Sequence, residues 1–252
     1  CEDHYASLFM DERGLKLFEP FRSETMPNLS NATRCRIIDD LLRAKLQHDR
    51  EHRIVTIGAG FDTRPFRMVG GIWAEVDELG LLELKDAKLP ISGCDNPLSR
   101  IAIDFAKDSL EEGLRDLATD ERVTVVIEGV WFYLNREAIA TALRVLRSLF
   151  PAHDLICDLM DARFFQRYGR RLQAKLSPLG AVMTDRPRRP AEMFLESGYE
   201  QLNVVPMMER AHELGALQAI ADIPSWASWL MLLVTSPAMK GYAVYAFSMR
   251  TG

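Results

Sequence analysis

Residues 55–68 of this 252-residue sequence, V-T-I-G-A-G-F-D-T-R-P-F-R-M, bring several chemically capable groups into one short stretch. An apolar run leads into the turn Gly58-Ala59-Gly60, and a carboxylate, a hydroxyl and two guanidiniums follow it. Because glycine has no side chain, a ligand can approach the backbone of such a turn closely. The stretch therefore predicts a binding site whose ligand lies against the turn.

Other polar groups stand at the ends of three more predicted strands. In an open parallel sheet, ligands bind outside the carboxyl ends of the strands. An Asp in such a position can also simply cap the next helix. Glu128 fits that explanation poorly, because a carboxylate directly after the largely apolar run 123–127 needs a partner. The predicted strands cover 53–57, 72–76, 100–103 and 123–127, and they end in the glycine turn, in Asp77 and Glu78, in Asp104 and Phe105, and in Glu128 and Gly129.

The spacing of these groups favours a nucleoside that carries no phosphate. Asp77 follows Gly58 by about 20 residues, a distance at which an acid can accept hydrogen bonds from a ribose diol. The turn lacks the third glycine of dinucleotide sites, and Asp62 would place negative charge where phosphates lie. S-adenosylmethionine is such a nucleoside, with a sulfonium, an ammonium and a carboxylate. Glu128 and Asp62 could receive the ammonium, and an arginine could hold the carboxylate.

Strands and helices alternate along residues 53–160, and these elements must position the groups named above. Such alternation indicates βαβ units, and hence an α/β fold with a doubly wound, mostly parallel sheet. The run 123–127 is continuously apolar apart from one threonine, which is typical of a strand buried on both faces. Further helices are predicted near 79–85, 109–118, 136–150 and 162–176, and further strands near 155–159, 201–205 and 242–249.

The two ends of the chain are expected to flank this sheet within a single domain, 1–252. Residues 1–30 look irregular, and Asn31 or Thr33 is expected to cap a helix over 33–47. The apolar stretch 218–234, with Trp226 and Trp229, could be a lid or a dimer face, so a homodimer stays open. The expected division is an N-terminal helical cover at 1–50, a cofactor-binding half at 51–161, and a C-terminal helical substrate cap with closing strands at 162–252.

The composition of the sequence bears on whether the protein binds nucleic acid, a membrane or a metal. The net charge of −5 argues against nucleic acid, and the sequence has no apolar run of the roughly 20 residues that a membrane span needs. The four cysteines are scattered, which favours reduced thiols and a cytoplasmic location. No metal centre is predicted. The basic run 186–190 reads as a solvated loop or as an anion-binding edge.

The motifs at 31–42, 56–68, 74–80 and 126–137 resemble those of the leucine carboxyl methyltransferase family. The run G-A-G-x-D-T-R is more specific than a generic methyltransferase turn. That family includes an enzyme that methylates a protein C-terminal leucine and bacterial enzymes that esterify polyketide and other small-molecule acids. The resemblance implies a class I, Rossmann-like methyltransferase that uses S-adenosyl-L-methionine.

The resemblance also assigns roles by position. Arg34 matches the arginine that binds the methionine carboxylate, Asp77 the ribose acid, and Tyr133 a tyrosine near the methyl group. Two departures are visible: the segment between Asp77 and Asp104 is short, and Asp77-Glu78-Leu79 replaces the common Asp-Leu-Pro. The remaining cofactor-binding residues are Gly58, Ala59, Gly60, Asp62, Glu78, Asp104 and Phe105 along the strand ends, and Glu128 and Gly129 at the amino-acid end.

The chemistry of the acceptor follows from the absence of a base in these motifs. A carboxylate is ionised near neutral pH and needs no base, whereas a phenol or alcohol would usually need a histidine. We therefore expect an O-methyltransferase of small-molecule acids, in the manner of secondary metabolism, with Tyr133 and Arg64 as its catalytic residues. Arg64 could instead form a structural salt bridge. The alternatives are a hydroxyl O-methyltransferase of aromatic metabolites, a protein C-terminal carboxyl methyltransferase, and a non-catalytic protein that retains the fold.

Overall fold

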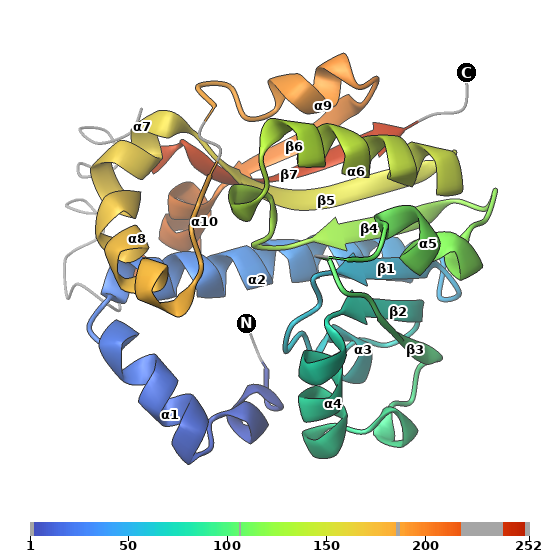
Figure 1. Ribbon diagram of the computed structural model, residues 1–252, viewed down its shortest axis with the longest axis horizontal. Helices are drawn as coiled ribbons and strands as arrows, with labels where there is room; N and C mark the ends of the chain where they lie inside the picture. The colour runs from blue at the N-terminus through green and yellow to red at the C-terminus, as the bar shows by residue number, and fades with distance from the viewer. Residues whose placement is uncertain (1–2, 106, 185–186, 218–238, 250–252) are drawn as a thin grey trace.

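The computed structural model describes residues 3–105, 107–184, 187–217 and 239–249, and its centre is a seven-stranded sheet (Figure 1). The strand order is β3-β2-β1-β4-β5-β7-β6. Strands β1 to β5 pair in parallel, and β7 runs antiparallel to both β5 and β6. The strands are β1 (Arg53–Ile57), β2 (Ile72–Asp77), β3 (Leu98–Ala102), β4 (Val123–Ile127), β5 (His153–Met160), β6 (Glu200–Pro206) and β7 (Tyr242–Met249).

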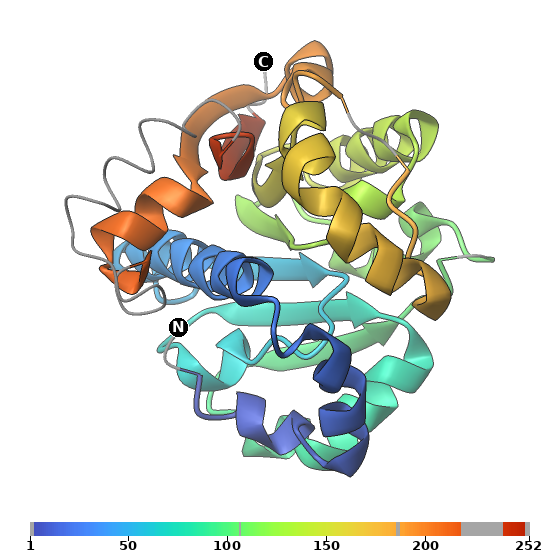
Figure 2. The ribbon, with the colours of Figure 1, turned by 90° about the vertical axis from the view of Figure 1, so that its left-hand side faces the viewer.

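Helices cover both faces of the sheet. Helix α2 lies on one face and α6 on the other, as Figure 2 shows. The predicted doubly wound, mostly parallel α/β fold is therefore confirmed. The helices are α1 (Glu12–Phe18), α2 (Thr25–His48), α3 (Arg64–Arg67), α4 (Leu79–Lys88), α5 (Leu110–Leu114), α6 (Arg136–Leu149), α7 (Ala162–Phe164), α8 (Arg170–Leu176), α9 (Glu192–Glu196) and α10 (Met207–Glu213). A π-helical segment, Phe165–Gly169, joins α7 to α8.

Two apolar clusters form the core, one on each face. On one face, Ile38 and Leu42 of α2 pack against residues of β1, β4 and β5 such as Ile54. On the other face, Leu143 and Leu146 of α6 pack against the opposite sides of the same strands. Because every residue of β4 is buried, the run 123–127 has the two-sided burial that its composition predicts.

Most predicted elements agree with the structure to within a few residues, but the start of α2 differs. This helix begins at Thr25, so Asn31 and Thr33 lie inside it and the predicted cap is wrong. Pro27 does not prevent this earlier start, because a first-turn residue needs no backbone N–H. The segment 1–30, expected to be irregular, contains α1 and two short 3₁₀ turns.

The carboxyl ends of β1 and β4 form the point at which the chain reverses its direction across the sheet. Strand β1 pairs with β2 on one side and with β4 on the other, so the connections leave in opposite directions. Ligands of open α/β sheets bind in the crevice at such a point. Within the described residues, no helix is long and apolar enough to cross a membrane. Trp226, Trp229 and the rest of 218–234 lie outside the described residues.

A buried ion cluster attaches α4 to the sheet beside this point. Lys85 of α4 and Glu75 of β2 are both fully buried, with 2.6 Å between Nζ and Oε1. Arg100 of β3 pairs with the second oxygen of Glu75 at 3.0 Å. Because α4 follows Asp77 and Glu78 directly, this cluster fixes where the end of β2 lies.

Replacing Lys85 by methionine should lower the free energy of unfolding by about 3 kcal/mol, because it leaves the buried Glu75 with only one cationic partner. Urea unfolding followed by circular dichroism measures this loss. Lys16→Met is the matched control, since the Lys16–Glu12 pair is 75% and 86% exposed. Equal losses in the two variants would contradict the structural role of the buried pair.

Candidate active site

The glycine turn at the end of β1 has one packed glycine and one open glycine. Gly58 has a φ of 71°, and a Cβ there would lie 2.5 Å from Cγ2 of Val130. Gly60 has a φ of 50°, and a Cβ there would meet no atom within 4 Å. Ala59 is buried between them. The backbone at Gly60 therefore faces open space, where a ligand can approach it.

Asp77 holds this turn from the end of β2. Its Oδ2 accepts a hydrogen bond of 2.6 Å from the Gly60 N–H, and its Oδ1 accepts one of 2.7 Å from the Glu78 N–H. An ionised carboxylate has about four lone-pair directions, so capacity for a ligand remains on each oxygen. Glu78 is exposed beside it. Asp77, predicted to bind a ribose, and Glu78, predicted to bind the cofactor, thus lie next to the open glycine.

Glu128 connects two arginines at the end of β4. Its Oε1 accepts from Nε of Arg34 at 2.8 Å, and its Oε2 accepts from Nη1 of Arg64 at 2.9 Å. Arg64 also pairs with Asp62 at 2.9 Å and with Asp39 of α2 at 2.8 Å. The predicted cofactor residues Arg34, Asp62 and Glu128 therefore belong to one ion cluster. Arg67 extends the cluster by pairing with Asp39.

The C-terminal strands complete the surroundings of Arg34. Its Nη1 donates to Asp158 of β5 at 3.0 Å and to the Tyr242 hydroxyl at 2.8 Å. The Tyr242 hydroxyl donates to Asp158 at 2.7 Å, and the Gly129 N–H donates to the other oxygen of Asp158 at 2.6 Å. Arg34 is 17% exposed, whereas Asp158 is fully buried. Arg34 is thus held in place and still partly accessible.

Arg64 was expected among the catalytic residues, but the structure places it as a buried ion-pair residue. It is 2% exposed, and its guanidinium contacts three carboxylates and the Cys35 carbonyl. The salt-bridge alternative raised by the sequence therefore describes its contacts. Both carboxylate oxygens of Asp62 accept hydrogen bonds from Arg64, one from its backbone N–H and one from its guanidinium.

Arginines and carboxylates balance one another in the ion cluster. Besides Arg34, Arg64 and Arg67, Arg43 also pairs with Asp39, at 3.6 Å, so four arginines stand against the four carboxylates Asp39, Asp62, Glu128 and Asp158. Burial alone would raise the pKa of Glu128, but Arg64 and Arg34 outweigh it and lower this pKa to about 2. Burial likewise opposes the ionisation of Asp39, and Arg67 and Arg64 still lower its pKa.

Apolar side chains lie exposed along the same edge of the sheet. Phe61, Leu79, Phe105 and Tyr133 follow the ends of β1, β2, β3 and β4, and each is at least 37% exposed. Asp104 is half-buried, and its Oδ2 pairs with Lys107 at 2.6 Å. Exposed apolar groups beside charged ones suit a ligand with a flat apolar part. The structure thus brings Asp104 and Phe105, which are predicted to bind the cofactor, to the same edge as the glycine turn.

Arg43, Arg67 and three further residues of the cluster were not among the predicted site residues. Asp39, Asp158 and Tyr242 come from α2, β5 and the start of β7. Asp158 had a signal, since a charged residue within the apolar run 155–160 must have a buried partner. Tyr242 had none, because nothing local indicates a contact with Arg34 across 208 positions.

Two histidines that could act as bases lie at the opposite edge. His52 immediately precedes β1 and contacts the Thr124 hydroxyl, and His153 opens β5 and contacts the Tyr199 hydroxyl. Burial lowers the pKa of both residues. Both residues lie at the amino ends of the strands, away from the glycine turn. His4 is exposed in the N-terminal segment.

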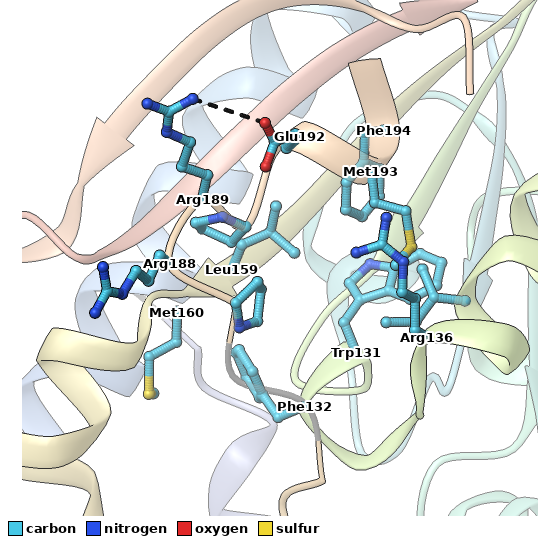
Figure 3. A pocket seen from close by; sticks show the side chains of 13 residues that line it. Trp131, Phe132, Arg136, Leu159, Met160, Arg188, Arg189, Glu192, Met193 and Phe194 are labelled. Carbon is cyan, nitrogen blue, oxygen red and sulfur yellow. Dashed lines mark ion pairs between the residues drawn. The ribbon is translucent and has the colours of Figure 1, made fainter. Parts of the chain in front are cut away.

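A pocket of about 410 Å³ lies beside the carboxyl ends of β4 and β5, between the first turn of α6 and the segment 187–194 (Figure 3). The short 3₁₀ turn η5 (Trp131–Tyr133) contributes Trp131 and Phe132 to its wall. The end of β5 contributes Leu159 and Met160. Trp131 and Phe132 are buried in the core and also line the pocket.

The sheet order and the polar carboxyl edge define a Rossmann-like methyltransferase fold. A DUF574 family protein from Streptomyces avermitilis superposes with a TM-score of 0.60 at 15% identity, over 98% of this chain and 95% of that one. Magnesium protoporphyrin IX methyltransferase from Synechocystis, crystallised with S-adenosylhomocysteine, superposes with a TM-score of 0.53 at 12% identity, over 96% of this chain and 97% of that one. A putative O-methyltransferase from Nostoc punctiforme superposes with a TM-score of 0.50 at 12% identity, over 88% of this chain and 57% of that one.

The sequence is also matched by a family model. The leucine carboxyl methyltransferase model matches residues 1–147, and the chain belongs to this family. This confirms the resemblance carried by the motifs at 31–42 and 56–68. A comparison with curated proteins finds no match. The structural likenesses, at 15% identity or less, concern the fold.

The pairing of Glu128 should make stability depend on pH. Its pKa is about 2 in the folded protein and about 4.5 ordinarily, so its stabilising effect is complete above pH 4.5 and is lost as the pH falls towards 2. We expect the wild type to have a higher free energy of unfolding than Glu128→Gln at pH 5.5. This advantage should shrink by about 2 to 3 kcal/mol when the pH is lowered to 2.5. Urea unfolding at intermediate pH values measures the difference. A constant difference between the two proteins would contradict the ion-pair assignment.

Proposed function

We propose that this protein is an S-adenosylmethionine-dependent O-methyltransferase that esterifies the carboxylate of a small-molecule acid. The observation that carries the proposal is the open backbone of Gly60 at the edge that also holds Arg34 and Glu128, each 17% exposed. S-adenosylmethionine carries a carboxylate and an ammonium, which are complementary to a guanidinium and a carboxylate. Membership of the leucine carboxyl methyltransferase family supports the reaction class.

The residues at the edge fit this cofactor. A Cβ at Gly60 would occupy free space, which is where a bound nucleoside would lie against the backbone. Asp77 and Glu78 would accept hydrogen bonds from a ribose diol. Phe105, 45% exposed, would cover the base, with Asp104 beside it. The Synechocystis methyltransferase, which has a similar fold, was crystallised with the demethylated cofactor product, and this lends further support.

The amino-acid end of the cofactor would meet Arg34 and Glu128. Both are 17% exposed, so each can contact a ligand while it keeps its ion pair. In this proposal Arg34 binds the carboxylate and Glu128 the ammonium. Arg64 acts as a positioning residue, since it holds Glu128 without reaching the ligand itself. Asp62 in turn holds Arg64.

When bound, S-adenosylmethionine supplies an electrophilic methyl group on a positively charged sulfur. The protein must then align the acceptor oxygen and exclude water. Tyr133 is exposed at the end of β4, and partial burial raises its pKa, so its hydroxyl stays protonated and can donate a hydrogen bond to the acceptor. A carboxylate acceptor requires no base, which agrees with the position of His52 and His153 at the other edge.

Each part of the chain has its own role in the proposed function. Residues 1–50 cover the cofactor, 51–161 bind it, and 162–252 form the cap over a small-molecule acceptor. In the structure, Phe9 of the N-terminal segment stacks on Phe61 next to the glycine turn, with 4.5 Å between ring centres. The cytoplasmic location and the homodimer stay predictions.

Substitution of Asp77 by alanine should weaken S-adenosylhomocysteine binding by about tenfold or more, because a ribose diol would lose a charged acceptor. Isothermal titration calorimetry measures the affinity. Glu83→Ala is the control, since Glu83 is an exposed acid on α4 away from the edge. Wild-type affinity in Asp77→Ala would contradict the cofactor site, provided that circular dichroism shows a folded variant.

Transfer of a labelled methyl group to a panel of aromatic acids and phenols tests the reaction. A product heavier by one methylene that mild base hydrolyses is an ester, whereas a base-stable product is an ether and would favour the hydroxyl alternative. Label found only on peptides with a free C-terminus would favour the protein carboxyl methyltransferase. Absence of cofactor binding at micromolar concentrations would favour a non-catalytic protein.

A further inference from the structure

The pocket beside η5 unites two features that are more than 50 positions apart in the sequence. One is the aromatic pair Trp131 and Phe132, and the other is the basic, proline-bounded run 186–190. The described part of that run, 187–190, forms one wall of the pocket. The basic run is therefore more than a solvated loop, because it encloses a cavity with aromatic residues on its other side.

The interior of the pocket is apolar and of a size for a small molecule. Its volume of about 410 Å³ falls in the range typical of ligand sites, about 300 to 1,000 Å³. Trp131 and Phe194 are nearly fully buried and meet edge-to-face, with ring centres 5.5 Å apart, so this wall is rigid. The other apolar lining residues are Phe132, Ile139, Leu159, Met160, Pro187, Pro190 and Met193.

The mouth of the pocket is positively charged. Arg136, Arg188 and Arg189 line it together with a single acid, Glu192, which pairs with Arg189 at 3.7 Å. Figure 3 shows the guanidinium of Arg136 beside the ring of Trp131, whereas Arg188 and Arg189 point outward from the opposite wall. Arg136 pairs with Glu196 at 3.1 Å, but both side chains are more than half exposed, and such a pair is weak.

The start of α6 adds to this positive potential. Arg136 and Ile139 belong to the first turn of this 14-residue helix, and both line the pocket. The N-terminus of a helix carries a partial positive charge, which favours an anion nearby. The mouth thus combines a guanidinium, a helix N-terminus and an apolar interior, which together suit an amphipathic anion rather than a neutral hydrocarbon.

A single ring separates this pocket from the ion cluster. Phe132 lines the pocket and contacts the ring of Tyr242 edge-to-face, with 5.8 Å between ring centres. The hydroxyl of Tyr242 in turn donates to Asp158 and contacts Arg34. The residue that follows Phe132 is Tyr133, which the proposed function places against the acceptor.

We propose that this pocket binds the methyl acceptor, and that the acceptor is a flat aromatic acid. Its ring lies in the apolar interior between Trp131 and the wall formed by 187–190, and Arg136 pairs with an anionic group at the mouth. The identification of the occupant as the acceptor rests on the proposed function. The pocket's preference for an aromatic anion rests on its own residues and is tested without the reaction.

The test compares 2-naphthoate with its neutral analogue 2-acetylnaphthalene by isothermal titration calorimetry of the full chain. We expect 2-naphthoate to bind more tightly than the neutral probe. Arg136→Gln should weaken the binding of 2-naphthoate by about threefold to tenfold and leave the affinity for 2-acetylnaphthalene unchanged, because only the anion pairs with the guanidinium. Arg144→Gln is the matched control, an exposed arginine on the same helix outside the pocket. Equal binding of 2-naphthoate to the wild type and Arg136→Gln would overturn the proposal.

A second variant tests the interior of the pocket. Met193 is half-buried in the lining, and Met193→Trp should fill the space and abolish binding of both probes. Undiminished binding to this variant would place the probes elsewhere and overturn the proposal.

The same samples separate this inference from the proposed function. Met193→Trp should bind S-adenosylhomocysteine as the wild type does. A wild type that binds 2-naphthoate through Arg136 but not S-adenosylhomocysteine would overturn the proposed function and leave the aromatic-anion site standing. A wild type that binds S-adenosylhomocysteine but neither probe would overturn the pocket proposal alone.

Discussion

The ion pairs that Glu128 makes with Arg34 and Arg64 connect most of the elements on which the site depends. Arg34 comes from α2, Arg64 from the turn after β1, and Glu128 from the end of β4. Moving charges out of water is costly, and pairing offsets the cost only when the geometry is good. A shift of any one element would leave a buried charge without a partner. The cluster therefore fixes the relative positions of these elements more strictly than apolar packing could.

The strands and the functional edge were predictable because their signals are local. Arg53–Ile57, Val123–Ile127 and Tyr242–Met249 have the bounds that their apolar runs indicate, and polar residues stand at the predicted strand ends. The partners of those residues were not predictable. Arg64 could have faced either a ligand or a carboxylate, and its contact with Asp39 of another helix decides the matter. Hydrophobic periodicity records which face of an element is buried, not which distant charge it meets.

The edge and the aromatic pocket differ in how their charges are balanced. In the cluster around Glu128, arginines and carboxylates pair with one another, whereas the lining of the pocket has three arginines and the single acid Glu192. The side chain of Phe132 lies between the two regions, since it contacts Tyr242 on one side and lines the pocket on the other. The unbalanced positive charge would attract an anion to the pocket rather than to the edge.

The place of Tyr242 at the start of β7 has a consequence for biosynthesis. Its hydroxyl contacts Arg34 across 208 positions, and β7 is inserted between β5 and β6. Chains emerge from the ribosome N-terminus first, and contacts so distant in sequence close last. The sheet from β1 to β5 can assemble while Arg34 and Asp158 still lack the tyrosine hydroxyl that joins them. The contacts of Arg34 are thus complete only once β7 has been synthesised and has paired with β5.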